Sequence, residues 1–211
     1  MNTYKNLFNN SLSVQKSIIG IVGVRGVGKT SLISSICEKT SDLVYSIYMS
    51  EELKKYSLAQ TQKKFFENTI EQRDRLRHEF GKNLINVLQE QNGPILLDLH
   101  LTDIREGQRK IIQPESLLKI INRYIFLDAS DETILSRRKS GETRGRSLDI
   151  TSITQERTAE LTALKYIVNK FQSSYQIFSA EGKIHDLKEK ISNKLHLSET
   201  SIKNLHHKRI E

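Results

Sequence analysis

The sequence lacks the features that mark disulfide-rich, membrane-spanning and repetitive proteins. It has one cysteine, Cys37, which excludes an internal disulfide and which we expect to fill part of the core. No apolar run approaches the roughly 20 residues that cross a bilayer, and residues 1–16 lack the apolar centre of a secretory signal. No internal repeat or low-complexity stretch is visible. We therefore expect a cytoplasmic protein that makes no membrane contact.

The composition is that of a globular protein with a surplus of basic residues. Of the 211 residues, 36% are hydrophobic and 27% are charged, which provides enough apolar material for one sizeable core. The formal net charge is +8. Such a charge is typical of nucleic-acid binding, but a site for polyphosphate also needs cations. Once the cations of such a site are set aside, the remaining basic charge is concentrated near the C-terminus, in residues 183–211, so composition alone leaves nucleic acid open as a partner.

One segment carries a specific chemical signal. Residues 23–30 read Gly-Val-Arg-Gly-Val-Gly-Lys-Thr, which is the GxxxxGK[ST] spacing of a phosphate-binding loop. The segment follows the apolar run Ile18–Val22 and precedes a predicted helix at 30–37, whose positive end would face the same phosphates. We expect ATP here. Lys29, as an exposed loop cation, would reach the β- and γ-phosphates, and the Thr30 hydroxyl would bind Mg²⁺.

The apolar runs predict the fold class. Five of them are typical of buried strands: Ile18–Val22, Val44–Tyr48, Ile95–Asp98, Tyr124–Asp128 and Tyr175–Phe178. Helical patterns lie between them at 61–91, 114–122, 131–139 and 153–171. Apolar strands that alternate with helices indicate a parallel sheet covered on both faces, with ligands at the carboxyl ends of the strands. We therefore predict a three-layer α/β P-loop NTPase fold with a five-stranded parallel sheet flanked by helices.

Two further polar residues follow the third predicted strand. Asp98 closes that strand, where an acid beside the phosphate loop holds the Mg²⁺ shell or positions a substrate, although a strand-ending aspartate is also a common turn former. His100 either contacts substrate or bonds loop backbone. The predicted nucleotide-binding residues are Gly23, Gly26, Val27, Gly28, Lys29, Thr30, Ser31, Asp98 and His100, with Thr30 and Asp98 as the metal ligands.

The phosphate loop, the acid-x-His of Asp98-Leu99-His100 and the later Arg144-Gly145-Arg146 form a combination that resembles the archaeal-type adenylate kinase family of P-loop nucleoside monophosphate kinases. The resemblance extends over about residues 18–182 and implies a short arginine-rich lid at about 137–150. It also implies reversible phosphoryl transfer from Mg-ATP to AMP or a related nucleoside monophosphate, which yields two nucleoside diphosphates. The assembly implied by the family is a homo-oligomer, specifically a trimer.

The arginines fit this chemistry on physical grounds. Phosphoryl transfer between two nucleotides gathers negative charge, and the planar guanidinium binds phosphate oxygens in two places without losing its own charge. The predicted catalytic cations are Lys29, Arg105, Arg138, Arg144 and Arg146. Arg73 and Arg77 have two readings, as further phosphate ligands or as part of a solvated helix face.

The chain divides by pattern into an N-terminal extension (1–16), a kinase domain (17–182) and a basic helical tail (183–211). The tail is either a terminal helix packed on the core with a solvated basic end, or a contact for nucleic acid or a partner. A second function therefore stays open, a regulatory P-loop ATPase whose tail binds a partner. The acceptor also stays open, because Tyr48-Met49-Ser50-Glu51 departs from the family's usual monophosphate-site segment.

Overall fold

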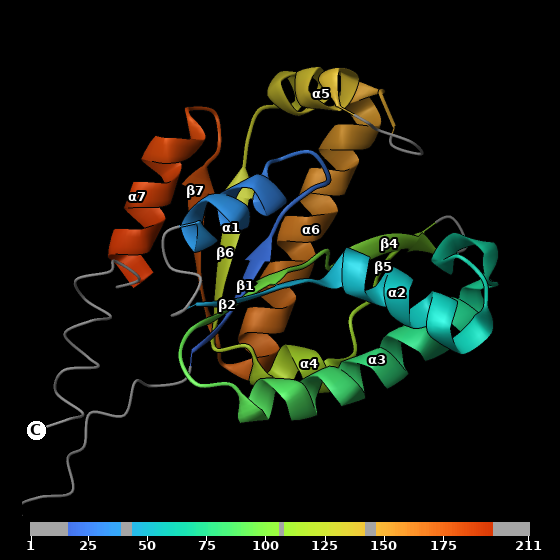
Figure 1. Cartoon of the computed structure of the whole chain (residues 1–211). Coiled ribbons are helices and arrows are strands. Elements are labelled where there is room, and N and C mark those ends of the chain that lie inside the picture. Colours follow the sequence, from blue (N-terminus) through green and yellow to red (C-terminus); the bar gives the residue numbers. More distant parts are fainter. Residues whose placement is uncertain (1–16, 39–43, 106–107, 142–146, 196–211) are drawn as a thin grey trace, which may run out of the picture.

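A five-stranded parallel sheet forms the centre of the molecule (Figure 1). The structure is a computed structural model that describes residues 17–38, 44–105, 108–141 and 147–195. The strands are β1 (Ile18–Val22), β2 (Tyr45–Tyr48), β3 (Ile95–Asp98), β6 (Arg123–Asp128) and β7 (Ser174–Ser179). Their order across the sheet is β2-β3-β1-β6-β7, and all neighbours run parallel. The predicted sheet is confirmed.

Helices cover both faces of this sheet (Figure 1). They are α1 (Lys29–Cys37), α2 (Met49–Thr61), the 3₁₀ helix η1 (Phe65–Glu67), α3 (Ile70–Glu90), α4 (Glu115–Ile120), α5 (Asp131–Ser140), α6 (Ile150–Phe171) and α7 (Ile184–Leu195). Helices α1 and α7 pack on one face, and α3, α4 and most of the buried stripe of α6 pack on the other. The three-layer α/β fold expected from the sequence is therefore observed.

The central strand β1 explains why the sheet is apolar on both sides. All five of its residues are buried, and successive side chains enter opposite core clusters, Ile19 and Ile21 on the α1 face and Ile18 and Val22 on the α6 face. Gly20 is needed between them, because a Cβ at that position would lie 2.8 Å from the buried ring of Tyr124.

The structure differs from the sequence prediction in two places. Helix α2 begins at Met49, where no helix is predicted, and the helical stretch predicted from 61 is instead η1 followed by α3. An antiparallel pair of strands, β4 (Thr102–Arg105) and β5 (Gln108–Ile111), occupies a segment expected to be loop. Both elements are largely polar: α2 buries only Met49 and Ser57, so neither offers the apolar periodicity on which the prediction depends.

The described part of the tail is a packed helix. Leu187 and Ile191 of α7 are buried in the same core cluster as Ile33 and Ile36 of α1. This confirms the helical pattern over 184–195, while residues 196–211 lie outside the described residues. Among the helices that the structure describes, none has the length and hydropathy required to cross a membrane.

Candidate functional site

The phosphate loop lies at the carboxyl end of β1 and leads directly into α1. Its three glycines, Gly23, Gly26 and Gly28, have φ of 139°, 89° and 111°. Residues with a Cβ rarely adopt this backbone conformation. A Cβ on Gly23 would also approach the carbonyl oxygen of Leu127 to 2.6 Å. The loop therefore depends on its glycines for its shape, and it borders an open cleft of about 700 Å³.

Lys29 is folded into the loop. Its Nζ donates to the carbonyl oxygens of Gly23 (2.8 Å) and Val24 (3.1 Å), and it lies 3.4 Å from Nε2 of His100. Only 4% of the residue is exposed, so the expectation of an exposed loop cation is wrong. Lys29 nevertheless lines the cleft, and so does His100 beside it.

Thr30 and Asp98 meet because β1 and β3 are neighbours in the sheet. The register pairs Ile21 with Asp98, which brings the end of β3 beside the first turn of α1. The Thr30 hydroxyl donates to Oδ2 of Asp98 over 2.6 Å. Mg²⁺ takes one or two protein carboxylates or hydroxyls and completes its shell with water and substrate phosphates, and this oxygen pair beside the phosphate loop fits such a site.

His100 is held through its backbone as well as through its side chain. Its carbonyl oxygen accepts from Nε2 of Gln113 (2.6 Å), and the next backbone N–H, that of Leu101, donates to Oε2 of Glu160 (3.0 Å). Glu160 also accepts from the N–H and the hydroxyl of Thr102, each at 2.7 Å. Burial raises the pKa of Glu160, whereas these hydrogen bonds and the charge of Lys29 act in the opposite direction.

Sequence reasoning missed Glu160, although the sequence contains a signal for it. The residue lies on the apolar face of α6, at helical spacing from the buried Ile153, Ala163, Leu164 and Ile167. A carboxylate on such a face needs hydrogen-bond donors from the elements packed against it, and here the donors come from the turn after β3.

The two arginines at the end of α5 have different environments. Arg137 lines the cleft, where its guanidinium donates to the carbonyl oxygens of Val27 (2.9 Å) and Ala180 (2.6 Å). Arg138 is fully buried, and its guanidinium is engaged by protein oxygens behind the loop. The catalytic role predicted for Arg138 stays a prediction, and of these two arginines it is Arg137 whose side chain lines the cleft.

The other predicted cations are not placed. Arg105 is the last residue of β4, and only its backbone is described. Arg144 and Arg146, together with residues 142–146 of the expected lid, lie outside the described residues. Their assignment to the transferring phosphoryl group stays a prediction.

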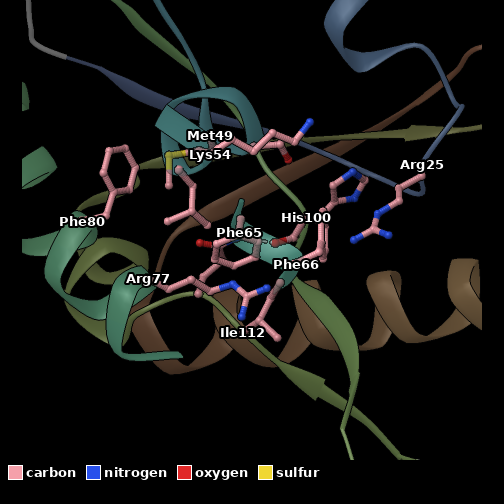
Figure 2. A pocket seen from close by; sticks show the side chains of 12 residues that line it. Arg25, Met49, Lys54, Phe65, Phe66, Arg77, Phe80, His100 and Ile112 are labelled. Carbon is pink, nitrogen blue, oxygen red and sulfur yellow. Dashed lines mark hydrogen bonds between the residues drawn. The ribbon is translucent and has the colours of Figure 1, made fainter. Parts of the chain in front are cut away.

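A second pocket adjoins the cleft and is shown in Figure 2. Its walls are apolar and come from α2, η1 and α3, and basic or polar side chains lie among them. The lining consists of Arg25, Met49, Ser50, Leu53, Lys54, Phe65, Phe66, Arg77, Phe80, His100, Ile112 and Gln113. Four of these, Arg25, Ser50, Lys54 and His100, also line the cleft, so the two spaces meet at a polar junction.

Arg77 is fixed at the floor of this pocket. Its guanidinium carbon lies 4.8 Å from the centre of the Phe65 ring, and its Nη1 pairs with Asp74 at 2.9 Å. A weaker pair with Asp103 at 3.7 Å ties it to β4. Arg77 is 6% exposed, so the reading as a solvated helix face is wrong for this residue.

Solved structures with the same architecture include kinases and a resistance protein. Shikimate kinase from Bacteroides thetaiotaomicron has 18% identity and a TM-score of 0.56, with 85% of this chain and 98% of that chain covered. Deoxyadenosine kinase from M. mycoides with bound dATP has 16% identity and a TM-score of 0.53, with 85% and 99% covered. A tunicamycin resistance protein from Deinococcus radiodurans has 15% identity and a TM-score of 0.53, with 87% and 98% covered. At these identities the likeness shows the fold.

Family membership comes from the sequence itself. No curated protein matches the chain. A family model described as an AAA domain, AAA_17, matches residues 22–154, which include the phosphate loop, Asp98, His100 and the helices that wall the second pocket. Since this span is more than half of the chain, the protein belongs to the AAA_17 family of P-loop proteins.

Proposed function

We propose that the protein is a P-loop kinase that transfers the terminal phosphoryl group of Mg-ATP to a small acceptor. The observation that carries the proposal is the junction between the two spaces, where Arg25, Ser50, Lys54 and His100 line both the phosphate cleft and the second pocket. A nucleotide hydrolase needs no acceptor pocket beside its phosphate loop. A transferase does, because the two substrates must meet in line.

The donor side of the reaction rests on the loop. Its backbone N–H groups and the N-terminus of α1 would hold the phosphates of ATP, and Lys29 would exchange its two carbonyl partners for phosphate oxygens. Thr30 and Asp98 would hold Mg²⁺, which neutralises charge on the phosphates when it is bound. Arg137, which donates to the carbonyl oxygen of Ala180 and lines the cleft, would be a further cation for the nucleotide phosphates.

The acceptor we propose is AMP or a related nucleoside monophosphate. The rings of Phe65, Phe66 and Phe80 give the second pocket flat apolar walls suited to a base (Figure 2). Arg25 and Lys54 put positive charge at the junction, where the acceptor phosphate would lie. This distribution of apolar walls and cations fits a phosphorylated nucleoside better than a small polyhydroxylated acid.

The proposal is tested by product stoichiometry with a panel of nucleoside monophosphates. ATP consumption should depend on the added monophosphate and should yield two nucleoside diphosphates per turnover. Release of ADP and inorganic phosphate without an acceptor would indicate an ATPase instead. If ADP formation depends only on a non-nucleotide alcohol, the assignment as a kinase would stand and the proposal of a nucleotide acceptor would be refuted.

A variant pair links the activity to the second pocket. Phe66→Ala should raise the KM for the monophosphate by about tenfold while the KM for ATP stays within about twofold, because only the acceptor loses an aromatic wall. Leu58→Ala is the matched control, since Leu58 is an exposed residue of α2 outside the pocket lining. Equal KM values in Phe66→Ala and wild type would place the acceptor elsewhere.

A further inference from the structure

Two carboxylates on one face of α6 bond to groups that support residues of the junction. Glu156 and Glu160 are four residues apart, which places them one above the other on the helix. Figure 1 shows α6 running from the α5 end of the molecule to the α4 end, so one helix carries both carboxylates. Glu160 is 3% exposed, and 19% of the Glu156 side chain is exposed.

Glu160 fixes the peptide group that follows His100. The N–H of that peptide, on Leu101, donates to Glu160, and its carbonyl oxygen, on His100, accepts from Gln113. Because both polar atoms of one planar group are bonded, the plane cannot rotate without breaking a buried hydrogen bond. The fixed plane restrains the backbone from which the His100 side chain extends.

Glu156 fixes the backbone of Arg25 through Arg138. Its Oε2 accepts from Nη2 of Arg138 over 2.6 Å, and the same guanidinium donates to the carbonyl oxygens of Arg25 (3.0 Å) and Ser147 (2.9 Å). The fit is close, since a Cβ on Gly26 would lie 3.1 Å from Cγ of Arg138. Arg138 is fully buried, so its charge needs the Glu156 carboxylate.

We propose that Glu156 and Glu160 are positioning residues for phosphoryl transfer, which hold Arg25 and His100 at a fixed spacing across the junction of the two substrate spaces. The proposal rests on the proposed function. Neither carboxylate touches a reacting atom. Their effect is on alignment, and a displacement of about 1 Å between donor and acceptor is enough to lower turnover about a hundredfold.

The test replaces each carboxylate by its amide. Glu160→Gln puts an NH₂ group where a backbone N–H now donates, and Glu156→Gln removes the charge opposite Arg138. We expect each to lower kcat at least about tenfold while the KM for ATP stays within about threefold. Glu115→Gln is the matched control. Glu115 is an exposed residue of α4, and it pairs with Lys170 of α6 (3.1 Å), so this variant also removes a carboxylate that contacts α6. Thr102→Val, which deletes one hydrogen bond to Glu160, serves as a milder variant should Glu160→Gln fail to fold.

A spectroscopic measurement separates this proposal from the proposed function. The imidazole resonances of His100, assigned by their loss in His100→Gln, should shift in Glu160→Gln or Thr102→Val and stay unchanged in Glu115→Gln. Lowered thermal stability with kcat and the His100 resonances unchanged would overturn the positioning role. Absence of acceptor-dependent turnover in the wild type would refute the proposed function, and the His100 resonances would still decide whether Glu160 holds this side chain.

Discussion

The hydroxyl of Thr30 donates to the carboxylate of Asp98 across 2.6 Å, which joins the first turn of α1 to the end of β3. The two residues are far apart in sequence and meet because β1 and β3 are neighbours in a parallel sheet. Both side chains offer oxygen atoms beside the phosphate loop, which is the ligand type that Mg²⁺ selects.

Asp98→Asn should therefore change the response to Mg²⁺. We expect the Mg²⁺ concentration for half-maximal turnover to rise at least about tenfold, because an amide is a weaker ligand than a carboxylate for a hard cation. Turnover measured against Mg²⁺ at fixed ATP provides the comparison. Asp149→Asn is the control, since Asp149 caps α6 and asparagine caps equally well. An unchanged Mg²⁺ profile in Asp98→Asn would remove Asp98 from the metal site.

Lys29→Ala should abolish phosphoryl transfer and leave a folded protein. Loss of the ammonium removes the cation for the β- and γ-phosphates, and we expect kcat to fall at least about a hundredfold. Because the carbonyl oxygens of Gly23 and Val24 lose their donor, the free energy of unfolding should fall by about 1–2 kcal/mol. Lys55→Ala, at an exposed pair with Glu52, controls for the loss of a lysine. Near-normal turnover of Lys29→Ala at saturating ATP would exclude the donor site.

A glycine pair tests the shape of the loop. Gly23→Ala should destabilise the protein by about 1–3 kcal/mol or prevent folding, since φ is 139° and the new Cβ would lie 2.6 Å from the Leu127 carbonyl oxygen. Gly182→Ala should be close to neutral, because nothing lies within 4 Å of a Cβ there. Denaturant unfolding of both variants measures the difference, and equal stabilities would mean that the loop takes another conformation.

Shortening the tail separates the contribution of helix α7 from that of the residues that follow it. Deletion of residues 200–211 should spare turnover, because the buried contacts of α7 come from Leu187 and Ile191. Deletion from residue 184 should cost several kcal/mol, since each of these side chains contributes up to about 1.5–3 kcal/mol by burial. Thermal unfolding and turnover of the two truncations give the result. A large loss of turnover in the shorter deletion, with the fold intact, would make the tail part of the active assembly.

The sequence was sufficient for the elements that bury continuous apolar surface. Strands such as β1 and β3 are buried on both faces, so their composition alone separates them from helices and loops. The phosphate loop was predictable for another reason. Its spacing is a recognised motif only between a strand and a helix, which placed it between β1 and α1.

The second pocket could not be predicted, because two of the elements that form its walls, α2 and η1, carry no clear sequence signal. Helix α2 exposes most of its length, and Phe66 of η1 is 61% exposed, so their apolar residues resemble scattered surface residues. The positions of Lys29 and Arg138 depend on contacts with carbonyl oxygens, which every residue has and which therefore leave no trace in the composition.

The position of β1 in the sheet has a consequence for synthesis of the chain. β1 precedes the other described strands in the chain and is one of the most apolar, yet its two neighbours are β3 and β6, which end at Asp98 and Asp128. During translation β1 stays without a partner until β3 is complete at Asp98, and it lacks its second neighbour until β6 is complete at Asp128. Its pairing on both edges therefore depends on long-range contacts, which form slowly. Chains released before residue 128 leave β1 with at least one unpaired hydrogen-bonding edge, and such fragments should require chaperones to stay in solution.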